Sequence, residues 1–164
     1  MMNIPLLLTV QVIVILMYNN KTRGELLKKL KMTSSCYMEI ISYGYKQLPL
    51  ESCGVLASSN GYLIDTFIPI INDHPNPLHF FSFQPQSWIS TLYQLQHDDL
   101  QLIGYMHTHP NEEAIPTSSD IVGFDYQKQQ LLCIVSYKQK DSPYIRLYQH
   151  LPTKGMKDYP LMLT

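Results

Sequence analysis

Short apolar runs that alternate with helix-patterned segments are the feature that most restricts how this chain can fold. The runs SCGVLAS (52–58), LQLIGYMHTH (100–109) and LLCIVSY (131–137) have the composition of buried strands. Apolar side chains recur at helical spacing in two other segments, 36–47 and 85–97. Because strands and helices that alternate along a chain pack in layers, the sequence predicts an α/β domain with a mixed sheet.

Turn and capping residues place the remaining elements. Asn60-Gly61 is a strong turn signal, so the strand at 52–58 and a strand at 61–71 are expected to form a hairpin. Thr33 or Ser34 is expected to cap the first helix, and Pro49 to end it. The other expected elements are a short strand at 80–83, a helix at 117–127, an edge strand at 144–150 and a Pro-rich, weakly patterned tail.

Size, charge and cysteine content exclude several classes of protein. A chain of 164 residues suffices for one domain that buries about two-thirds of its unfolded surface. A composition of 45% hydrophobic and 15% charged residues is globular, and a net charge of −1 argues against nucleic acid as a partner. Three cysteines without a CxxC pair argue against a disulfide framework or a structural zinc knot.

An uncharged run at 4–18 opens the sequence. A membrane-spanning helix needs about 20 apolar residues, and the run lacks the flanking features of a signal peptide. Three interpretations stay open: a short membrane anchor, a buried or accessory segment, or a start codon placed too far upstream. If the run spans a bilayer, the basic residues after it would keep the domain on the cytoplasmic side; these are Lys21, Arg23, Lys28, Lys29 and Lys31.

The expected organisation therefore has four parts. They are an apolar N-terminal segment at 1–20, a basic linker at 21–33, a domain at 34–150 and a tail at 151–164. The expected localisation is cytoplasmic, with a candidate membrane tether through 4–18. The sequence leaves the oligomeric state open.

Two histidines and an aspartate have the spacing of a metal site. Side chains alternate between the faces of a strand, so His107 and His109 are expected on one face, with Thr108 on the other. Pro110 ends the strand, and Asp120 falls in the first turn of the following helix, from which its carboxylate can return as a third ligand. Two imidazoles and a carboxylate suit Zn²⁺ and leave a fourth position open for water, as in catalytic zinc sites.

Each of these residues also has a simpler interpretation. Thr117 and Asp120 fit a helix-capping pattern, and an isolated His-x-His on a strand is more often not a metal site. Hydrolysis at a metal also needs a group that moves a proton, for which Glu51 at the mouth of a strand is the candidate. Glu112 and Glu113 are rivals that lie nearer in sequence, but a flexible loop positions a base poorly.

The segments ESCGVL and HTHPNEEAIPTSSD together resemble the signature of the JAMM (MPN-plus, JAB-type) metallopeptidases. That signature is a glutamate before Cys-Gly and a small aliphatic residue, then His-x-His, seven residues beginning with proline, and Ser-x-x-Asp. The order of strands and helices also follows the family, over roughly 36–150. The resemblance implies a three-layer α-β-α fold around a mixed sheet, similar to that of the zinc (cytidine) deaminases.

The resemblance also implies roles for individual residues. His107, His109 and Asp120 would bind one zinc ion per chain, and Glu51 would act as general base for a metal-activated water. Thr117 stands where the family has a serine that helps to stabilise the oxyanion, and its extra methyl group stiffens the side chain.

The function implied is a zinc-dependent peptidase or isopeptidase that acts on a protein or peptide substrate. The bond cleaved would lie at the C-terminal tail of a ubiquitin-like or sulfur-carrier protein. Two alternatives stay open, namely a non-catalytic MPN-type binding module and a zinc hydrolase of a non-peptide amide.

Overall fold

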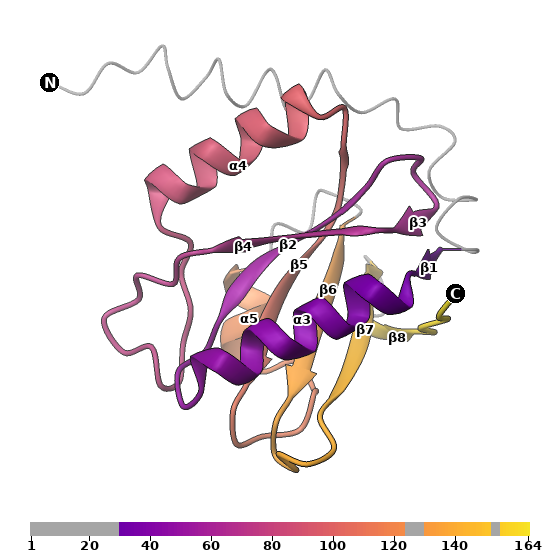
Figure 1. Cartoon of the computed structure of the whole chain (residues 1–164). Helices are drawn as coiled ribbons and strands as arrows, with labels where there is room; N and C mark the ends of the chain where they lie inside the picture. The colour runs from indigo at the N-terminus through magenta and orange to yellow at the C-terminus, as the bar shows by residue number, and fades with distance from the viewer. Residues whose placement is uncertain (1–29, 124–129, 152–154) are drawn as a thin grey trace, which may run out of the picture.

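A mixed six-stranded sheet runs through the centre of this protein (Figure 1). The structure, a computed structural model, describes residues 30–123, 130–151 and 155–164. The helices are α3 (Ser34–Gln47), α4 (Pro85–His97) and α5 (Ser118–Gly123). The strands are β1 (Lys31–Met32), β2 (Cys53–Ser58), β3 (Leu63–Ile64), β4 (Thr66–Ile70), β5 (Gln101–His109), β6 (Leu131–Ser136), β7 (Tyr144–Leu151) and β8 (Gly155–Tyr159).

The sheet has the strand order β4-β2-β5-β6-β7-β8. Within it, β5 and β6 pair in parallel, and the other described neighbours are antiparallel. The short strands β1 and β3 form a separate parallel pair. This arrangement confirms the predicted mixed sheet, and the parallel pair brings the end of β5 beside the end of β6.

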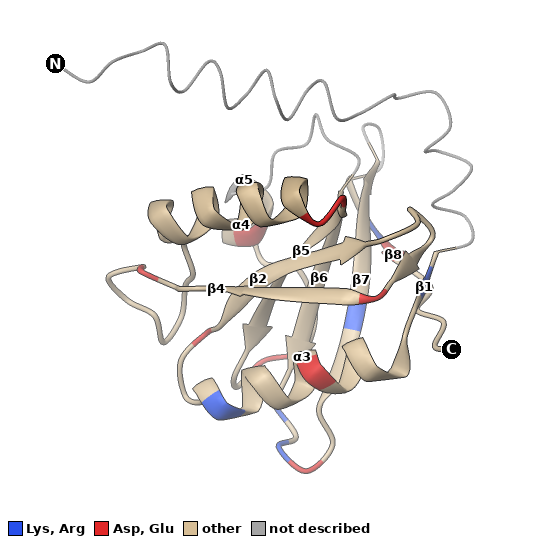
Figure 2. Ribbon diagram, turned by 45° about the horizontal axis from the view of Figure 1, so that its top comes forward, with Lys and Arg blue, Asp and Glu red and all other residues tan. Residues whose placement is uncertain are grey.

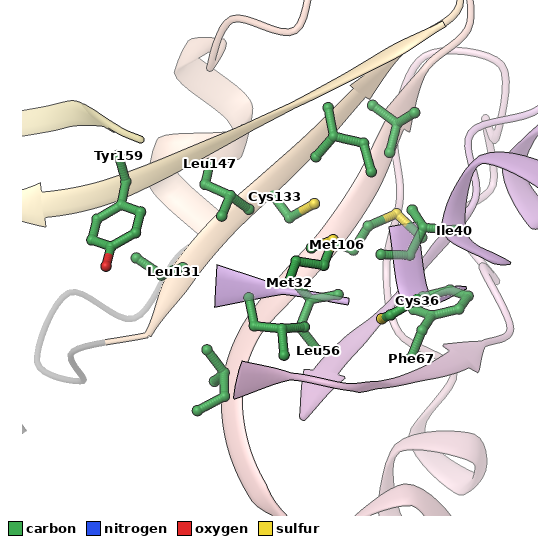
Figure 3. Packing of buried hydrophobic residues seen from close by; sticks show 14 of the residues in the cluster. Met32, Cys36, Ile40, Leu56, Phe67, Met106, Leu131, Cys133, Leu147 and Tyr159 are labelled. Carbon is green, nitrogen blue, oxygen red and sulfur yellow. The ribbon is translucent and has the colours of Figure 1, made fainter. Parts of the chain in front are cut away.

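Three layers result because both faces of the sheet are covered (Figure 2). Helix α3 packs on one face, and its buried Ile40 belongs to the same cluster as Met106 and Cys133 (Figure 3). The other face carries Leu132 and Ile134, which pack against Ala114 of the loop after β5, and α4 covers β2 and β4 on that side. Residues of β6 therefore alternate between two buried faces, which explains its unbroken apolar sequence. The predicted three-layer α/β fold is confirmed.

Local signals placed several elements correctly. The Thr33 side chain accepts a hydrogen bond from the backbone N–H of Cys36 at 3.1 Å, so Thr33 is the N-cap of α3. The turn at Asn60-Gly61 leads back into antiparallel pairing of β2 with β4. The strand expected at 61–71 is divided into β3 and β4 at Asp65, whose carboxylate accepts the backbone N–H of Ser59.

The C-terminal tail is the main departure from the sequence-based expectation. We expected weak patterning after residue 150 and an edge strand at 144–150, but β8 pairs with β7 and forms the edge instead. The sequence of β8 lacks the apolar alternation typical of a strand, because only Tyr159 is buried within it. The tail also continues to Leu163, which bridges Met32. The domain boundaries proposed above remain a prediction.

Two further expectations differ from the structure. Residues 80–83 form no strand among the described residues and contribute only an isolated bridge between Asn72 and Phe83. The helix expected at 117–127 is described from Ser118 to Gly123, and residues 124–129 lie outside the described part of the chain.

The predicted localisation requires correction. Within the three described ranges, the structure has no helix with the length and apolar character needed to cross a bilayer. The proposed anchor at 4–18 lies outside those ranges. No described helix supplies the candidate membrane tether that the expected localisation included, and that expectation is withdrawn.

Gly104 allows β5 and β6 to approach closely. A Cβ atom at this position would lie 2.4 Å from the backbone oxygen of Leu131, its partner on β6. We expect Gly104→Ala to lower the free energy of unfolding by about 1–3 kcal/mol, as overpacking does. Urea denaturation would measure this loss. The exposed substitution Lys157→Ala should change stability by less than about 0.5 kcal/mol, and an equally small effect of Gly104→Ala would contradict the packing argument.

Candidate active site

A cleft of about 420 Å³ opens where β5 ends and β2 begins. Its walls come from the segment before β2, the loop between β4 and α4, and the loop that joins β5 to α5. The residues that line it are Glu51, Leu78, His79, Phe80, His109, Pro110, Asn111, Glu112, Thr117, Ser119 and Asp120. Two predicted metal ligands, the predicted base and the predicted oxyanion donor therefore border one cavity.

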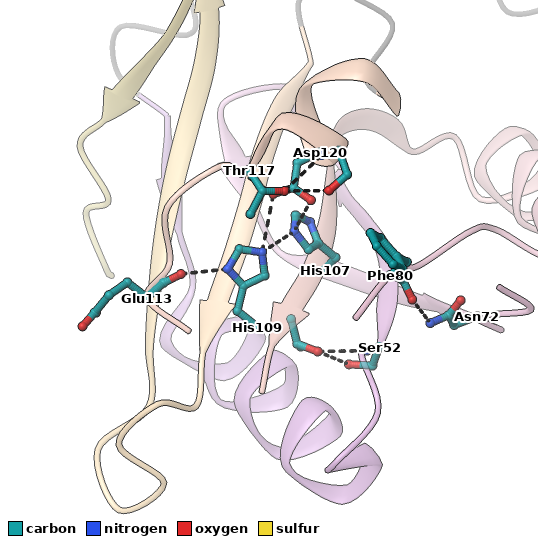
Figure 4. A network of polar contacts seen from close by, with 10 residues as sticks. Ser52, Asn72, Phe80, His107, His109, Glu113, Thr117 and Asp120 are labelled. Atoms are coloured by element: carbon teal, nitrogen blue, oxygen red, sulfur yellow. Dashed lines mark hydrogen bonds and ion pairs between the residues drawn. The ribbon is translucent and has the colours of Figure 1, made fainter. Parts of the chain in front are cut away.

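The strand period places the two histidines together, as predicted. Thr108 lies against Gly44 of α3, whereas His107 stacks on Phe81 at 4.5 Å between ring centroids on the other side of the sheet. His107 and His109 are both buried, and their Nε2 atoms are 3.0 Å apart. Asp120 faces them from the first turn of α5 (Figure 4).

The three side chains have a spacing that fits one metal ion. Asp120 Oδ1 lies 3.2 Å from His107 Nε2, and Oδ2 lies 3.5 Å from His109 Nε2. In a tetrahedral zinc site with bonds of about 2.0–2.2 Å, neighbouring ligand atoms are about 3.3–3.6 Å apart. The separations of the two imidazole nitrogens from the Asp120 carboxylate are close to this range, and His107, His109 and Asp120 could hold a metal ion.

The position of Asp120 is compatible with both helix capping and metal binding. Its Oδ2 accepts the backbone N–H of Thr117 at 2.7 Å, and its own N–H lies 3.4 Å from Thr117 Oγ1. This reciprocal pattern is a capping box, which fixes the carboxylate at the start of α5. Burial opposes ionisation, but hydrogen bonds with His107 and His109 hold the pKa of Asp120 well below its ordinary range. The carboxylate is therefore fixed and charged.

The two histidines differ in their other ring nitrogen. His109 Nδ1 lies 2.7 Å from the carbonyl oxygen of Glu113, so it donates a proton there and leaves Nε2 directed at the site. His107 Nδ1 is buried and has no hydrogen-bond partner among the described residues. Burial lowers the pKa of His107. Burial opposes the charged form of His109 too, but Asp120 and the Glu113 carbonyl raise its pKa.

Glu51 is held beside this group by the pairing of β2 with β5. The Ser52 N–H donates to Thr108 Oγ1 at 2.8 Å, and the Thr108 N–H donates to the Ser52 carbonyl at 3.0 Å. The backbone of Glu51 is fixed from the other side by Pro77, whose carbonyl accepts its N–H, and by the Asn72 amide, which donates to its carbonyl. Only 8% of Glu51 is exposed.

The burial of Glu51 makes its carboxyl group a weaker acid than an exposed glutamate. Desolvation is the main cause, and the nearby carboxylates of Asp120 and Glu112 add to it, while His109 opposes it. Together they raise the pKa of Glu51 to about 7. A carboxylate with such a pKa is suited to take up and release a proton near neutral pH.

Glu112 and Glu113, the other two candidates for the base, differ from Glu51 in their surroundings. The Glu113 carboxylate accepts a hydrogen bond from Lys138 Nζ at 2.9 Å and another from the Tyr144 hydroxyl, so it is engaged outside the cleft. Glu112 lines the cleft, but it is exposed. Thr117 borders the cleft with its hydroxyl 2.8 Å from that of Ser119. These positions favour Glu51 as the buried carboxylate of the site.

Comparison with known proteins identifies the family. Residues 33–148, well over half of the chain, match the profile of Prok-JAB, the prokaryotic homologs of the JAB domain. The chain belongs to the Prok-JAB family. The resemblance to JAB-type metallopeptidases that the sequence motifs suggested is thereby confirmed.

Two curated relatives of this Prok-JAB chain have informative names. A Thermus thermophilus protein named probable TtuB-protein conjugate cleaving protease is 30% identical over 76 residues, which are 46% of this chain and 50% of the relative. A Haloferax volcanii protein named desampylase is 27% identical over 73 residues, which are 44% of this chain and 52% of the relative. The chain thus spans about half the length of the curated relatives it matches.

Solved structures share the fold of this Prok-JAB domain, each with 82% of the chain covered. A protein from Desulfitobacterium hafniense has a TM-score of 0.72 at 21% identity, with 92% of that chain covered. A JAB1/MPN domain protein from Archaeoglobus fulgidus has a TM-score of 0.55 at 18% identity, with 99% covered. A structure described as a JAMM metalloprotease-like zinc site in the proteasome and signalosome has a TM-score of 0.52 at 16% identity, with 97% covered.

Sequence reasoning missed the residues that support the site. Asn72 uses its whole side-chain amide: it donates to the carbonyls of Glu51 and Phe80 and accepts from the backbone N–H groups of His74 and Ser82. Its place after a strand and before a Pro-rich loop was the available signal, since asparagine there commonly bonds nearby backbone. The stacking of Phe81 on His107 left no signal in the sequence.

The raised pKa of Glu51 predicts a stability change with a defined sign. The ionised form is disfavoured in the folded chain, so stability falls as pH rises from about 4.5 to about 7 and stays lowered above that range. A pKa raised from 4.5 to about 7 corresponds to a loss of up to about 3 kcal/mol in the free energy of unfolding above pH 7. In metal-free protein, Glu51→Gln should therefore raise the free energy of unfolding at pH 8 and change it little at pH 4.5.

Denaturant unfolding at the two pH values, in the presence of a chelator, would measure this difference. The matched control is Glu39→Gln, which alters an exposed glutamate on α3. Equal effects of Glu51→Gln at both pH values would contradict the burial argument.

Proposed function

We propose that this Prok-JAB chain is a zinc-dependent peptidase or isopeptidase. The observation that carries the proposal is the meeting of a His-His-Asp donor set with a buried glutamate of raised pKa in one cleft. A fixed, charged carboxylate and two buried imidazoles match the ligands of catalytic zinc sites. The description of a related fold as a metalloprotease-like zinc site supports zinc as the ion.

His107, His109 and Asp120 would hold one zinc ion. When bound, the ion would polarise the scissile carbonyl and make a water molecule more acidic. Glu51 would accept the proton of the attacking water at its carboxylate and donate it to the departing amine. Its backbone is fixed by Pro77 and Asn72, and the residue lines the cleft.

Thr117 would supply a hydroxyl donor to the oxygen on which charge develops. Thr117 lines the same cleft as Glu51, and the capping box fixes its backbone. The threonine methyl group restricts the torsion angle χ1, so the hydroxyl has few orientations. A donor that is fixed before the reaction stabilises an oxyanion at little reorganisation cost.

The substrate we propose is the C-terminal tail of a ubiquitin-like or sulfur-carrier protein, either extended or joined to another protein by an isopeptide bond. The names of the two relatives, a conjugate-cleaving protease and a desampylase, support this class of substrate. The loop from β5 to α5 is short and its Ala114 is buried against β7, so it adds no arm that would hold a second carrier. Processing of single carriers is therefore favoured over selection of chains.

The proposal predicts a loss of activity when the metal or Glu51 is removed. A ubiquitin-like carrier with a C-terminal extension should be cleaved by the zinc-loaded chain and not in excess chelator. Glu51→Gln should retain zinc but lower kcat by about 10²–10⁴-fold, the usual contribution of general acid–base catalysis. Glu39→Gln on α3 is the control and should cleave at the wild-type rate.

Three results would count against this mechanism. Full activity in chelator would exclude a catalytic role for the metal. Full activity of Glu51→Gln would exclude Glu51 as the general base. Stoichiometric zinc binding with no cleavage of any carrier would instead favour a binding module.

The role proposed for Thr117 has its own test. Thr117→Val keeps the shape but removes the hydroxyl, so kcat should fall by about 10²–10³-fold while KM changes little. Thr117→Ser should retain activity, because it keeps the donor. Ser118→Ala is the neighbouring control. Unfolding measurements would correct for the lost cap, worth about 1 kcal/mol, and a Thr117→Val enzyme of normal kcat would exclude the oxyanion role.

A further inference from the structure

The loop between β5 and α5 is fixed by side chains from β6 and β7, which lie far along the chain. The Ser136 hydroxyl donates to the Glu112 carbonyl, and the Tyr148 hydroxyl donates to the Ala114 carbonyl. The Tyr144 hydroxyl accepts the Ala114 N–H at 3.3 Å and donates to the Glu113 carboxylate. The N–H and the carbonyl of Ala114 are therefore both hydrogen-bonded, and the residue is fully buried.

The residue enclosed by these contacts is the partner of a predicted metal ligand. The Glu113 carbonyl accepts the Nδ1 proton of His109 at 2.7 Å, and Glu113 lies between the two residues whose carbonyls are bound. Its carboxylate is held as well, by Lys138 and Tyr144. The carbonyl thus has a fixed direction, and through it the His109 ring keeps Nε2 directed at His107 and Asp120.

We propose that Tyr144 and Tyr148 are positioning residues for His109, and that they set the metal affinity of the site without touching the metal. This inference rests on the metal site of the proposed function. A hydrogen-bond partner on the second ring nitrogen orients a metal-binding histidine, and its loss typically weakens metal binding about 10–100-fold. His107 has no such partner among the described residues, and its buried ring stacks on Phe81 instead.

The alternative is that the two hydroxyls only stabilise the fold. Tyr148 packs with Leu132 and Ile134, so Tyr148→Phe keeps the ring contacts and removes one hydrogen bond. Tyr137→Phe offers a matched control, because the buried Tyr137 donates to the Ile41 carbonyl at 2.6 Å, on the α3 side of the sheet. Both substitutions lose one tyrosine–carbonyl bond. Tyr137→Phe keeps the backbone bond from residue 137 to the His109 carbonyl, whereas Tyr148→Phe removes a side-chain bond to the loop that carries Glu113.

The experiment measures the zinc dissociation constant of the full chain by competition with a chelator, together with the free energy of unfolding. Tyr148→Phe and Tyr144→Phe should each weaken zinc binding about 10–100-fold. Tyr137→Phe should bind zinc within about twofold of the wild type at a similar loss of stability. Equal weakening in the Tyr137→Phe control, or zinc affinity unchanged in both loop variants, would overturn the proposal.

A second measurement does not depend on the metal. In metal-free protein at alkaline pH, long-range ¹H–¹⁵N NMR spectra should show the His109 proton on Nδ1 in the wild type and in Tyr137→Phe, and a mixture of tautomers in Tyr148→Phe. A wild-type protein that binds no zinc but shows this pattern would refute the metal site and leave the positioning role intact. A His109 proton on Nε2 in the wild type would overturn the positioning role itself.

Discussion

The antiparallel pairing of β2 with β5 is the constraint on which the candidate site depends. It places Cys53 opposite His107, and the bonds between Ser52 and Thr108 extend the pairing to the residue after Glu51. A slip of one residue would turn both histidines toward α3 and away from the cleft. Close packing of Thr108 on β5 against Gly44 of α3, and of Gly104 on β5 against the Leu131 backbone of β6, opposes such a slip.

The site combines charge and burial in a way that costs stability. Two imidazoles and a capping box stabilise the charge of an ionised Asp120. Desolvation instead favours the uncharged form of the buried Glu51. Two carboxyl groups in one cleft therefore have pKa values displaced in opposite directions. Such divergence separates a ligand from a proton acceptor, and active sites commonly show it.

Local spacing was sufficient to predict the components of the site, but not what supports them. The strand period put His107 and His109 on one face, and the capping pattern put Asp120 at a helix start; the structure agrees with both. Tyr144 and Tyr148 act on residues 30 or more positions away, and no pattern within one element reports such contacts. Strand β8 was missed for a related reason, because it is an exposed strand whose pairing with β7 fixes it, not its sequence.

A crystal structure of the zinc-soaked chain, with anomalous data at the zinc edge, tests the central claim most directly. The account predicts one strong peak about 2.0–2.2 Å from His107 Nε2, His109 Nε2 and an Asp120 oxygen, with the Glu51 carboxyl group facing the open coordination position. No peak there, a peak at other residues, or a Glu51 side chain directed out of the cleft would contradict it.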